Sequence, residues 1–325
     1  LETLLEHFQK LGKGTGLVTT SYLTDATPAS FGAHESNRYD SARIASDYLT
    51  QTRPEVLMGG AYFGADAATV AEAGYTVVSD RASLAALDAA LHPRVSCLFG
   101  WGYLPYEADG LGELPSLSDM AAKALDVLGR DPDGFFLMVE GGLIDVACHG
   151  NDLLRCVGET LAFDAAVRRI VAWAEGREDT LVLVLADHET GGLSVVQDNG
   201  PGLLPDVQWA SAAHTGTPVG LYGWGVNAHL AARVTDNTQV AGVARSQVPQ
   251  PGEGLWVERL APQQTLTLWA TASGGVYRVE HAAALEPSAW QPCATVTAAQ
   301  SRVTFVHTNA ASRAQGFYRM VPVQP

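Results

Sequence analysis

Residues 135–149, FFLMVEGGLIDVACH, are the most informative stretch of the sequence for the fold. The apolar residues 135–139 predict a buried strand, and Glu140 stands at its carboxyl end, before two glycines. Asp145 and His149 follow with a spacing of four, which places both on one face if a helix begins after the glycines. A strand that leads into a helix is the repeating unit of α/β proteins.

The same alternation continues on both sides of this stretch. The other runs that predict buried strands are residues 16–20, 56–58, 75–78, 95–99 and 181–186. Segments with helical spacing are residues 65–73, 83–91, 118–128 and 153–174, and a further helix opens the chain and ends at Gly12. We therefore expect an α/β fold, a mostly parallel sheet with helices on both faces. Catalytic groups of such sheets lie at the carboxyl ends of the strands.

The composition changes in the last part of the chain. Short alternating segments at 265–270, 276–280 and 303–307 stand between Gly, Pro, Ser and Asn, which is typical of a small all-β module. Residues 248–254, VPQPGEG, form a hinge that breaks helix and strand alike. The sequence thus predicts two domains, residues 1–247 and residues 255–325.

The charge balance excludes some functions. The 325 residues carry 35 acidic and 20 basic side chains, a formal net charge of -15, so binding of nucleic acid is not expected. A small phosphate can still bind where metal ions or arginines reverse the local field. The longest apolar runs are the size of strands, far short of the roughly 20 residues of a membrane span.

The four cysteines form no C-x-x-C pair, which argues against a zinc ribbon and against a disulfide-dense scaffold. They are Cys97, Cys148, Cys156 and Cys293. Cys148 and Cys156 are eight residues apart, about 12 Å on one continuous helix. At that distance no disulfide is expected between them.

Polar residues follow a second apolar run. Residues 181–186 end in Asp187 and His188, and charge at the end of a buried strand is costly unless it is paired or binds a metal ion. Gly191 and Gly192 allow the backbone to turn close to such a site. A further histidine, His214, precedes the apolar segment 218–222. Ordinary core or surface roles are expected for the other histidines, His7, His34, His92, His229, His281 and His307.

Carboxylate and imidazole groups on adjacent helical turns, such as Asp145 and His149, can chelate zinc at about 2.0 to 2.2 Å. A helix-start Asp near a surface His is an equally good interpretation of this pair alone. The segment after the strand at 16–20 holds Asp25 and Thr27, and a helix is expected to start at Pro28. Arg38 could return to the pocket as a bidentate phosphate clamp.

The segments that carry Asp25 to Arg38, Glu140 to His149, Asp187 to His188 and His214 together resemble the alkaline phosphatase family. They match its motifs in amino-acid sequence and in order, over about residues 1–230. The resemblance implies ligands for three metal sites. One zinc ion would be bound by Asp145, His149 and His214, and a second zinc ion by Asp187 and His188. Magnesium would be bound by Thr27 and Glu140. The resemblance also implies that Asp25 holds a magnesium-bound water and that Arg38 grips the substrate phosphate.

The implied activity is metal-dependent hydrolysis of a small phosphate monoester through a phosphoserine intermediate, in a periplasmic or extracellular protein that could be a homodimer. The family's nucleophilic Ser and the Asp shared by zinc and magnesium would precede Leu1. We therefore expect an N-terminally incomplete chain that is inactive alone. The serines that follow the first strand do not match the nucleophile's motif: Ser21, Ser30, Ser36 and Ser41.

Three other functions compete with this one. The same residues would serve a non-catalytic metal- or phosphate-binding protein. A sulfatase is disfavoured because no cysteine begins the C-x-P-S-R pattern. The β module could bind sugars on a platform of Trp256, Trp269 and Trp290, although a core role suits them better, and its segment 316–321 is similar to C-terminal modules of secreted bacterial proteins.

Overall fold

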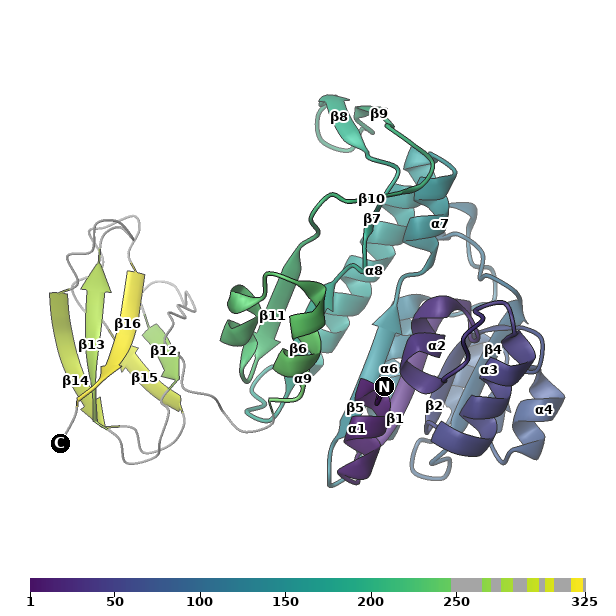
Figure 1. Cartoon of the computed structure of the whole chain (residues 1–325), viewed down its shortest axis with the longest axis horizontal. Coiled ribbons are helices and arrows are strands. Elements are labelled where there is room, and N and C mark those ends of the chain that lie inside the picture. The colour runs from purple at the N-terminus through teal and green to yellow at the C-terminus, as the bar shows by residue number, and fades with distance from the viewer. Residues whose placement is uncertain (247–264, 270–275, 283–290, 298–301, 307–316, 324–325) are drawn as a thin grey trace. The chain divides into compact units, whose positions relative to one another are not determined.

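The computed structural model describes residues 1–246, 265–269, 276–282, 291–297, 302–306 and 317–323 (Figure 1). The chain divides into two compact units, Leu1–Glu175 with Ala186–Gly220, and Gly176–Leu185 with Leu221–Pro325. The predicted hinge at 248–254 lies outside the described residues, and so do Trp256 and Trp290. The domain boundaries at 247 and 255 stay predictions.

A five-stranded parallel sheet forms the centre of the first unit, in the order β3-β4-β2-β1-β5. Its strands are β1 (Gly14–Tyr22), β2 (Val56–Ala61), β3 (Thr76–Val78), β4 (Val95–Trp101) and β5 (Phe135–Glu140). Each strand was predicted from its apolar run. The pairing of β1 with both β2 and β5 brings the first strand and the fifth side by side, although more than 100 residues separate them.

Helices cover both faces of this sheet, which confirms the predicted α/β class. Neighbouring residues of β1 point to opposite faces: Leu17 packs in a cluster with Leu5, whereas Val18 packs with Met120. The helices of this unit are α1 (Leu4–Lys10), α2 (Ala26–Gly32), α3 (Ser41–Asp47), the π-helix η1 (Tyr48–Thr52), α4 (Ala67–Glu72), α5 (Arg81–Ala86), η2 (Glu107–Asp109), α6 (Leu117–Leu128), α7 (Leu143–His149) and α8 (Leu153–Ala174).

Short strands extend the first unit beyond the sheet. β7 (Glu189–Thr190) pairs with β10 (His214–Thr215), and β8 (Ser194–Gln197) pairs with β9 (Asp206–Gln208), both antiparallel. Figure 1 shows the β8–β9 hairpin projecting from the first unit. The β7–β10 pair matters most for the site, because it joins the segment after residue 186 to the segment that carries His214.

The second unit contains a two-stranded antiparallel sheet and further antiparallel strands. β6 (Leu181–Leu185) pairs with β11 (Leu221–Gly225), and η3 (Ala228–Arg233), η4 (Asn237–Gln239) and α9 (Val240–Ala244) follow. β12 (Thr265–Trp269) pairs with β15 (Arg302–Val306), and β13 (Val276–Ala282) lies between β14 (Gln291–Thr297) and β16 (Phe317–Pro322). The pairs that β12 to β16 form confirm the predicted small β module in the last part of the chain.

Three local expectations were wrong. The helix expected at Pro28 begins at Ala26, because the Asp25 side chain accepts the Ala26 N–H at 2.8 Å and caps the helix there. The strand at 181–186 forms but is only half-buried, with Leu185 exposed, since its one partner in the described part of the chain is β11.

The third correction concerns two cysteines. Cys148 and Cys156 lie on separate helices, α7 and α8, because the chain turns between them with Asn151 at a φ of 49°. Their sulfur atoms are 3.2 Å apart. The distance of about 12 Å assumed one continuous helix, and it does not apply here.

No helix in the described ranges is both long and apolar enough to cross a lipid bilayer.

Candidate metal centre

Asp145 and His149 lie on α7, which begins directly after the glycines that follow β5. One helical turn separates them, and the His149 Nε2 atom is 3.3 Å from the Asp145 Oδ2 atom. The predicted helix and the predicted shared face are both present. Both side chains are partly exposed, so an ion can reach them from solvent.

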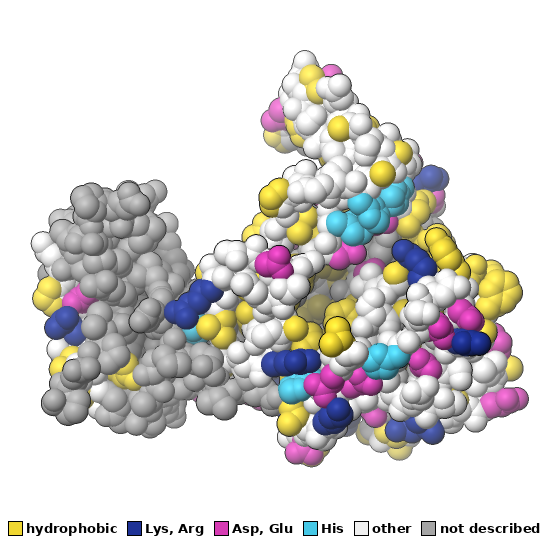
Figure 2. All heavy atoms as spheres, in the orientation of Figure 1, with side chains coloured by type: hydrophobic (Ala, Val, Ile, Leu, Met, Phe, Trp, Pro, Cys, Tyr) yellow, Lys and Arg dark blue, Asp and Glu magenta, His cyan; other side chains and the backbone are white. Residues whose placement is uncertain are grey.

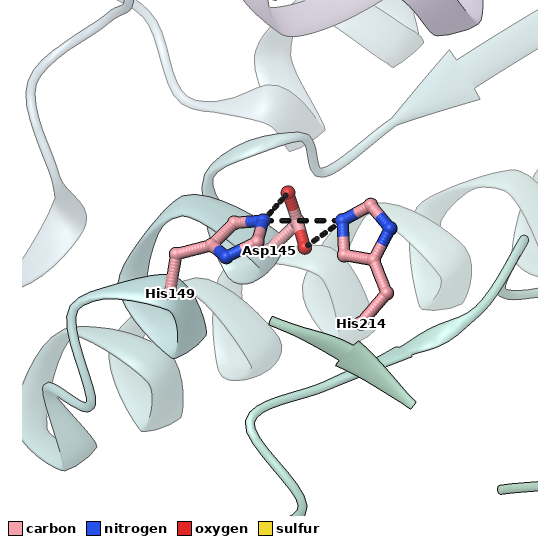
Figure 3. A group of neighbouring side chains, drawn as sticks. All are labelled: Asp145, His149 and His214. Atoms are coloured by element: carbon pink, nitrogen blue, oxygen red, sulfur yellow. Dashed lines mark hydrogen bonds and ion pairs between the residues drawn. The ribbon is translucent and has the colours of Figure 1, made fainter. Parts of the chain in front are cut away.

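His214 joins this pair from a distant part of the chain. In the β7–β10 pair His214 is opposite Thr190, and its Nε2 atom lies 3.1 Å from the His149 Nε2 atom and 3.6 Å from the Asp145 Oδ1 atom (Figure 3). The ligand atoms of the three residues all lie within 4.8 Å of one another, and no other such group was found among the described residues. Figure 2 shows histidine side chains gathered at the surface of the first unit.

Hydrogen bonds orient the donor atoms of this group. The His149 Nδ1 atom lies 2.7 Å from the Ala212 carbonyl oxygen, so Nδ1–H donates there and the Nε2 lone pair faces the other two ligands. The Thr190 hydroxyl donates to Asp145 Oδ1. Lone pairs of two imidazoles only 3.1 Å apart repel each other unless a proton or a cation lies between them. One carboxylate and two imidazoles oriented in this way fit zinc.

Asp187 and His188 lie beside this group. The His188 ring stacks on the His214 ring with centroids 3.5 Å apart, and its Nε2 atom is 3.1 Å from the Asp187 Oδ2 atom. The Thr190 hydroxyl is 3.3 Å from the His188 Nδ1 atom and also bonds Asp145. One hydroxyl therefore connects the two predicted zinc sites.

Glu140 ends β5 opposite Thr19 of β1, and the Thr19 hydroxyl donates to Glu140 Oε2 at 2.6 Å. Burial raises the pKa of Glu140, and hydrogen bonds from Thr19 and Thr27 oppose that rise. Negative charge on Asp25 and Asp187 raises it further. The structure thus brings Thr27 and Glu140 together, and both are oxygen donors of the kind that magnesium prefers.

Arg38 returns to Asp25, with its Nη2 atom 2.9 Å from Asp25 Oδ1. Asp25 also accepts a hydrogen bond from the buried Ser21 hydroxyl at 2.5 Å. The Arg38 side chain is 53% exposed, which leaves part of the guanidinium free to meet a ligand. A capped helix and a nearby Arg were expected, and the ion pair between them is what the structure adds.

The residues that support these side chains were not predicted from the sequence: Thr19, Ser21, Glu189, Thr190 and Thr215. Glu189 accepts the Gly192 N–H and the Thr215 hydroxyl, which fixes the turn beside β7. One signal was readable. Polar residues in the buried strand β1 need hydrogen-bond partners, so Thr19 and Ser21 could have been placed next to the site.

Comparisons with known proteins point to one family. The family model described as alkaline phosphatase matches residues 1–64 and 64–205, a range with every predicted site residue except His214. Alkaline phosphatase 3 of Bacillus subtilis is 39% identical over 208 residues, which cover 61% of this chain and 44% of that protein. Streptomycin-6-phosphate phosphatase of Streptomyces griseus is 33% identical over 319 residues, with 74% of this chain and 70% of that protein covered.

A solved structure is also similar. The cold-active alkaline phosphatase of a psychrophilic Shewanella sp. has a TM-score of 0.67 and 25% sequence identity, covering 77% of this chain and 79% of that one. The chain spans less than half the length of the Bacillus subtilis relative.

Proposed function

Since the chain belongs to the alkaline phosphatase family, we propose that the protein hydrolyses phosphate monoesters with the help of bound metal ions. The observation that carries this proposal is the convergence of Asp145, His149 and His214, in which the second nitrogen of His149 is already bonded to a carbonyl. Such a group presents one carboxylate and two imidazoles to a cation, and the His149 ring is already oriented by its bond to the Ala212 carbonyl.

In this proposal the first zinc ion is held by the three converging residues, and Asp187 and His188 hold the second. Thr27 and Glu140 bind magnesium, with Asp25 close to that ion. When bound, the metal ions stabilise negative charge on the attacking and leaving oxygens of phosphoryl transfer.

Arg38 binds the phosphate group. Its planar guanidinium can donate two parallel hydrogen bonds to two phosphate oxygens. The Asp25 carboxylate holds the guanidinium at 2.9 Å, and the Ser21 hydroxyl holds that carboxylate in turn. These contacts orient Arg38 before the ligand arrives, so less side-chain freedom is lost on binding.

We further propose that hydrolysis passes through a phosphoserine and that the nucleophilic Ser lies in an upstream part of the protein. On this view the 325 residues bind metal and phosphate but turn over esters very slowly. An attacking hydroxyl splits the reaction into two easier steps, and without it that gain is lost. We also propose that the protein works in the periplasm or outside the cell and that it forms a homodimer.

The test compares the 325-residue chain with a form extended by its upstream coding sequence, both supplied with zinc and magnesium. We expect the extended form to hydrolyse a chromogenic phosphate monoester and the shorter chain to do so far more slowly. Equal rates would place the nucleophile within Leu1–Pro325. Binding of zinc and phosphate by both forms, with hydrolysis by neither, would support a non-catalytic binding protein and overturn the proposal.

A further inference from the structure

Five aromatic side chains form a continuous row at the carboxyl ends of three neighbouring strands. Tyr22 ends β1, Tyr62 and Phe63 follow β2, and Trp101 and Tyr103 lie at or after the end of β4. Ring centroids are 5.4 Å apart for Tyr103 and Tyr22, 4.4 Å for Tyr22 and Tyr62, and 5.7 Å for Tyr62 and Trp101. Phe63 contacts both Tyr62 and Trp101, at 4.9 and 5.3 Å.

Much of this row is open to solvent. Phe63 and Trp101 are each 59% exposed and Tyr103 is 46% exposed, whereas Tyr22 and Tyr62 are half-buried beneath them. Single exposed apolar residues are common, but a contiguous group of large exposed rings marks a binding surface. The outer rings Phe63, Trp101 and Tyr103 belong to neither of the two core clusters that pack on the faces of the sheet.

The row begins beside Asp25, the carboxylate that holds the proposed phosphate ligand Arg38. The Tyr22 carbonyl accepts the Asp25 N–H at 2.9 Å, so Tyr22 and Asp25 are held in one turn. Burial raises the pKa of Tyr103, the carboxylates of Asp25 and Asp145 raise it further, and the positive charge of Arg38 lowers it. Tyr103 therefore lies within electrostatic range of both the proposed phosphate clamp and the first zinc site.

We propose that this aromatic row binds the alcohol portion of the substrate and selects phosphate monoesters whose alcohol carries a planar aromatic ring. The inference rests on the proposed function. With the phosphate on Arg38, an attached ring lies over the row and stacks on it, as bases stack on aromatic side chains in nucleic-acid-binding proteins. A nucleobase and a phenyl group share this chemistry, and an aliphatic alcohol such as glycerol lacks it.

The test measures binding by calorimetry to the zinc-loaded 325-residue chain. The probes are adenosine 5′-monophosphate, phenyl phosphate, glycerol 3-phosphate and inorganic phosphate. We expect the two aromatic esters to bind roughly tenfold more tightly than glycerol 3-phosphate. Which of the two binds better distinguishes a nucleobase from a phenyl group as the preferred ring.

Trp101→Ala and Phe63→Ala should each reduce that preference and leave the affinity for glycerol 3-phosphate unchanged. Tyr222→Ala, which removes a 71% exposed ring from the second unit, is the matched control and should change nothing. Equal affinities of the unmodified chain for aromatic and aliphatic esters would overturn the proposed role of the aromatic row and would leave the proposed function intact. Failure of inorganic phosphate to bind would instead overturn the proposed function, and the row with it.

An independent observation concerns Cys148 and Cys156. Both are buried free thiols, and their sulfur atoms lie 3.2 Å apart, within reach of a covalent bond after small side-chain rotations. Ala147 is their buried neighbour. Cys148 directly precedes the proposed zinc ligand His149, so a bond at this point would tie the end of α7 to the start of α8.

The geometry points to a disulfide between Cys148 and Cys156 that forms in an oxidising compartment. The oxidant is a disulfide: one thiolate attacks it and gives a mixed disulfide, and the other thiolate then displaces the oxidant's second sulfur as a thiol. Two protein thiols are oxidised and the oxidant's disulfide is reduced to two thiols. The short cross-link restricts the loop that begins at His149 and so slows the loss of metal.

Refolding the reduced chain in a mixture of oxidised and reduced glutathione tests this directly. We expect two of the four thiols to disappear and peptide mapping to join Cys148 with Cys156. The oxidised chain should release zinc to a chelator more slowly than the reduced chain, and Cys156→Ser should abolish the difference. Four remaining thiols, or a disulfide that involves Cys97 or Cys293, would overturn the assignment.

Discussion

Two groups of side chains lie at or just after the end of β5, and they are built in different ways. One is the imidazole cluster of Asp145, His149 and His214. The other is the hydroxyl–carboxylate group of Glu140, Thr19 and Thr27. Glu140 is opposite Thr19 in the central sheet, so the register of two parallel strands positions it. His214 is brought in by a two-residue strand pair and lies 65 residues from His149. The hydroxyl–carboxylate group depends on the core, and the imidazole cluster depends on a small surface assembly.

This difference has a consequence for how each group can be damaged. Substitutions near β7 and β10 should disrupt the imidazole cluster while the sheet stays folded, because those strands make few contacts with the core. Gly191 is central to that assembly: its N–H donates to the Ala213 carbonyl and its own carbonyl accepts the Ala210 and Ser211 N–H groups. The two groups can therefore be tested separately.

The largest expected effect comes from removing a ligand. His149→Ala takes away one of three converging donors and should weaken zinc binding by more than about 100-fold, the upper range for loss of a mere supporting contact. Metal analysis after dialysis at a fixed free-zinc concentration measures it. His34→Ala is the control, since His34 is exposed and bonds Glu6. Unchanged zinc content in His149→Ala would refute the ligand assignment.

Gly191→Ala should separate the surface assembly from the core. Gly191 has a φ of 92°, and a Cβ there would lie 2.6 Å from the Trp209 ring. We expect a loss of more than about 1 kcal/mol in the free energy of unfolding and a weaker zinc site. Gly200→Ala is a matched control, because Gly200 has a φ of 93° and open space around it.

Gly200→Ala should show the backbone strain without the effect on zinc. Thermal unfolding and zinc titration of both variants measure the two quantities. If the two variants bind zinc equally well, the position of His214 does not depend on Gly191. The imidazole cluster would then not depend on the surface assembly around β7 and β10.

Thr190→Val tests the supporting hydroxyl. It removes the hydroxyl that contacts Asp145 and His188 and keeps a β-branched side chain in β7. Zinc affinity should fall by about tenfold, as for other contacts that orient a ligand. Thr50→Val, which removes an exposed hydroxyl that donates to the Ser46 carbonyl, should leave zinc affinity unchanged. A tenfold fall in both variants would point to a general loss of stability.

The sequence predicted those parts of the site that depend on local spacing. The apolar run predicted the strand at 135–139, and the glycines after it predicted the start of the next helix. The spacing of four predicted that Asp145 and His149 share one helical face. Each strand of the parallel sheet was also predicted, because buried parallel strands are apolar along their whole length.

Contacts between distant segments could not be read in the same way. The pairing of His214 with Thr190 and of Thr19 with Glu140 depends on register, which no local pattern specifies. Cys148 and Cys156 were misjudged for a related reason: the turn at Asn151 was not recognised, so one helix was assumed where there are two. In both cases the missing information was the path of the chain between two correctly predicted elements.

The smallest expected effect compares Glu140 with a buried carboxylate away from the metal ligands. Glu159 of α8 is 2% exposed; burial raises its pKa, and the Glu107 N–H, which it accepts at 2.7 Å, opposes that rise. The folded state therefore holds the proton more tightly than the unfolded chain, whose pKa is near 4.5. Stability from this group is present below that value and is lost as pH rises through the folded pKa.

Glu159→Gln keeps an oxygen that can accept the Glu107 N–H and removes the titration. The melting temperatures of Glu159→Gln and of the unmodified chain should therefore be closest near about pH 4. Towards about pH 7 the melting temperature of the unmodified chain should fall below that of Glu159→Gln. Glu72→Gln, at an exposed helical position, should show no such divergence. A constant difference between Glu159→Gln and the unmodified chain across this range would mean that burial alone does not raise a carboxylate's pKa here. The raised pKa of Glu140 would then need a cause other than burial, such as the neighbouring charges of Asp25 and Asp187.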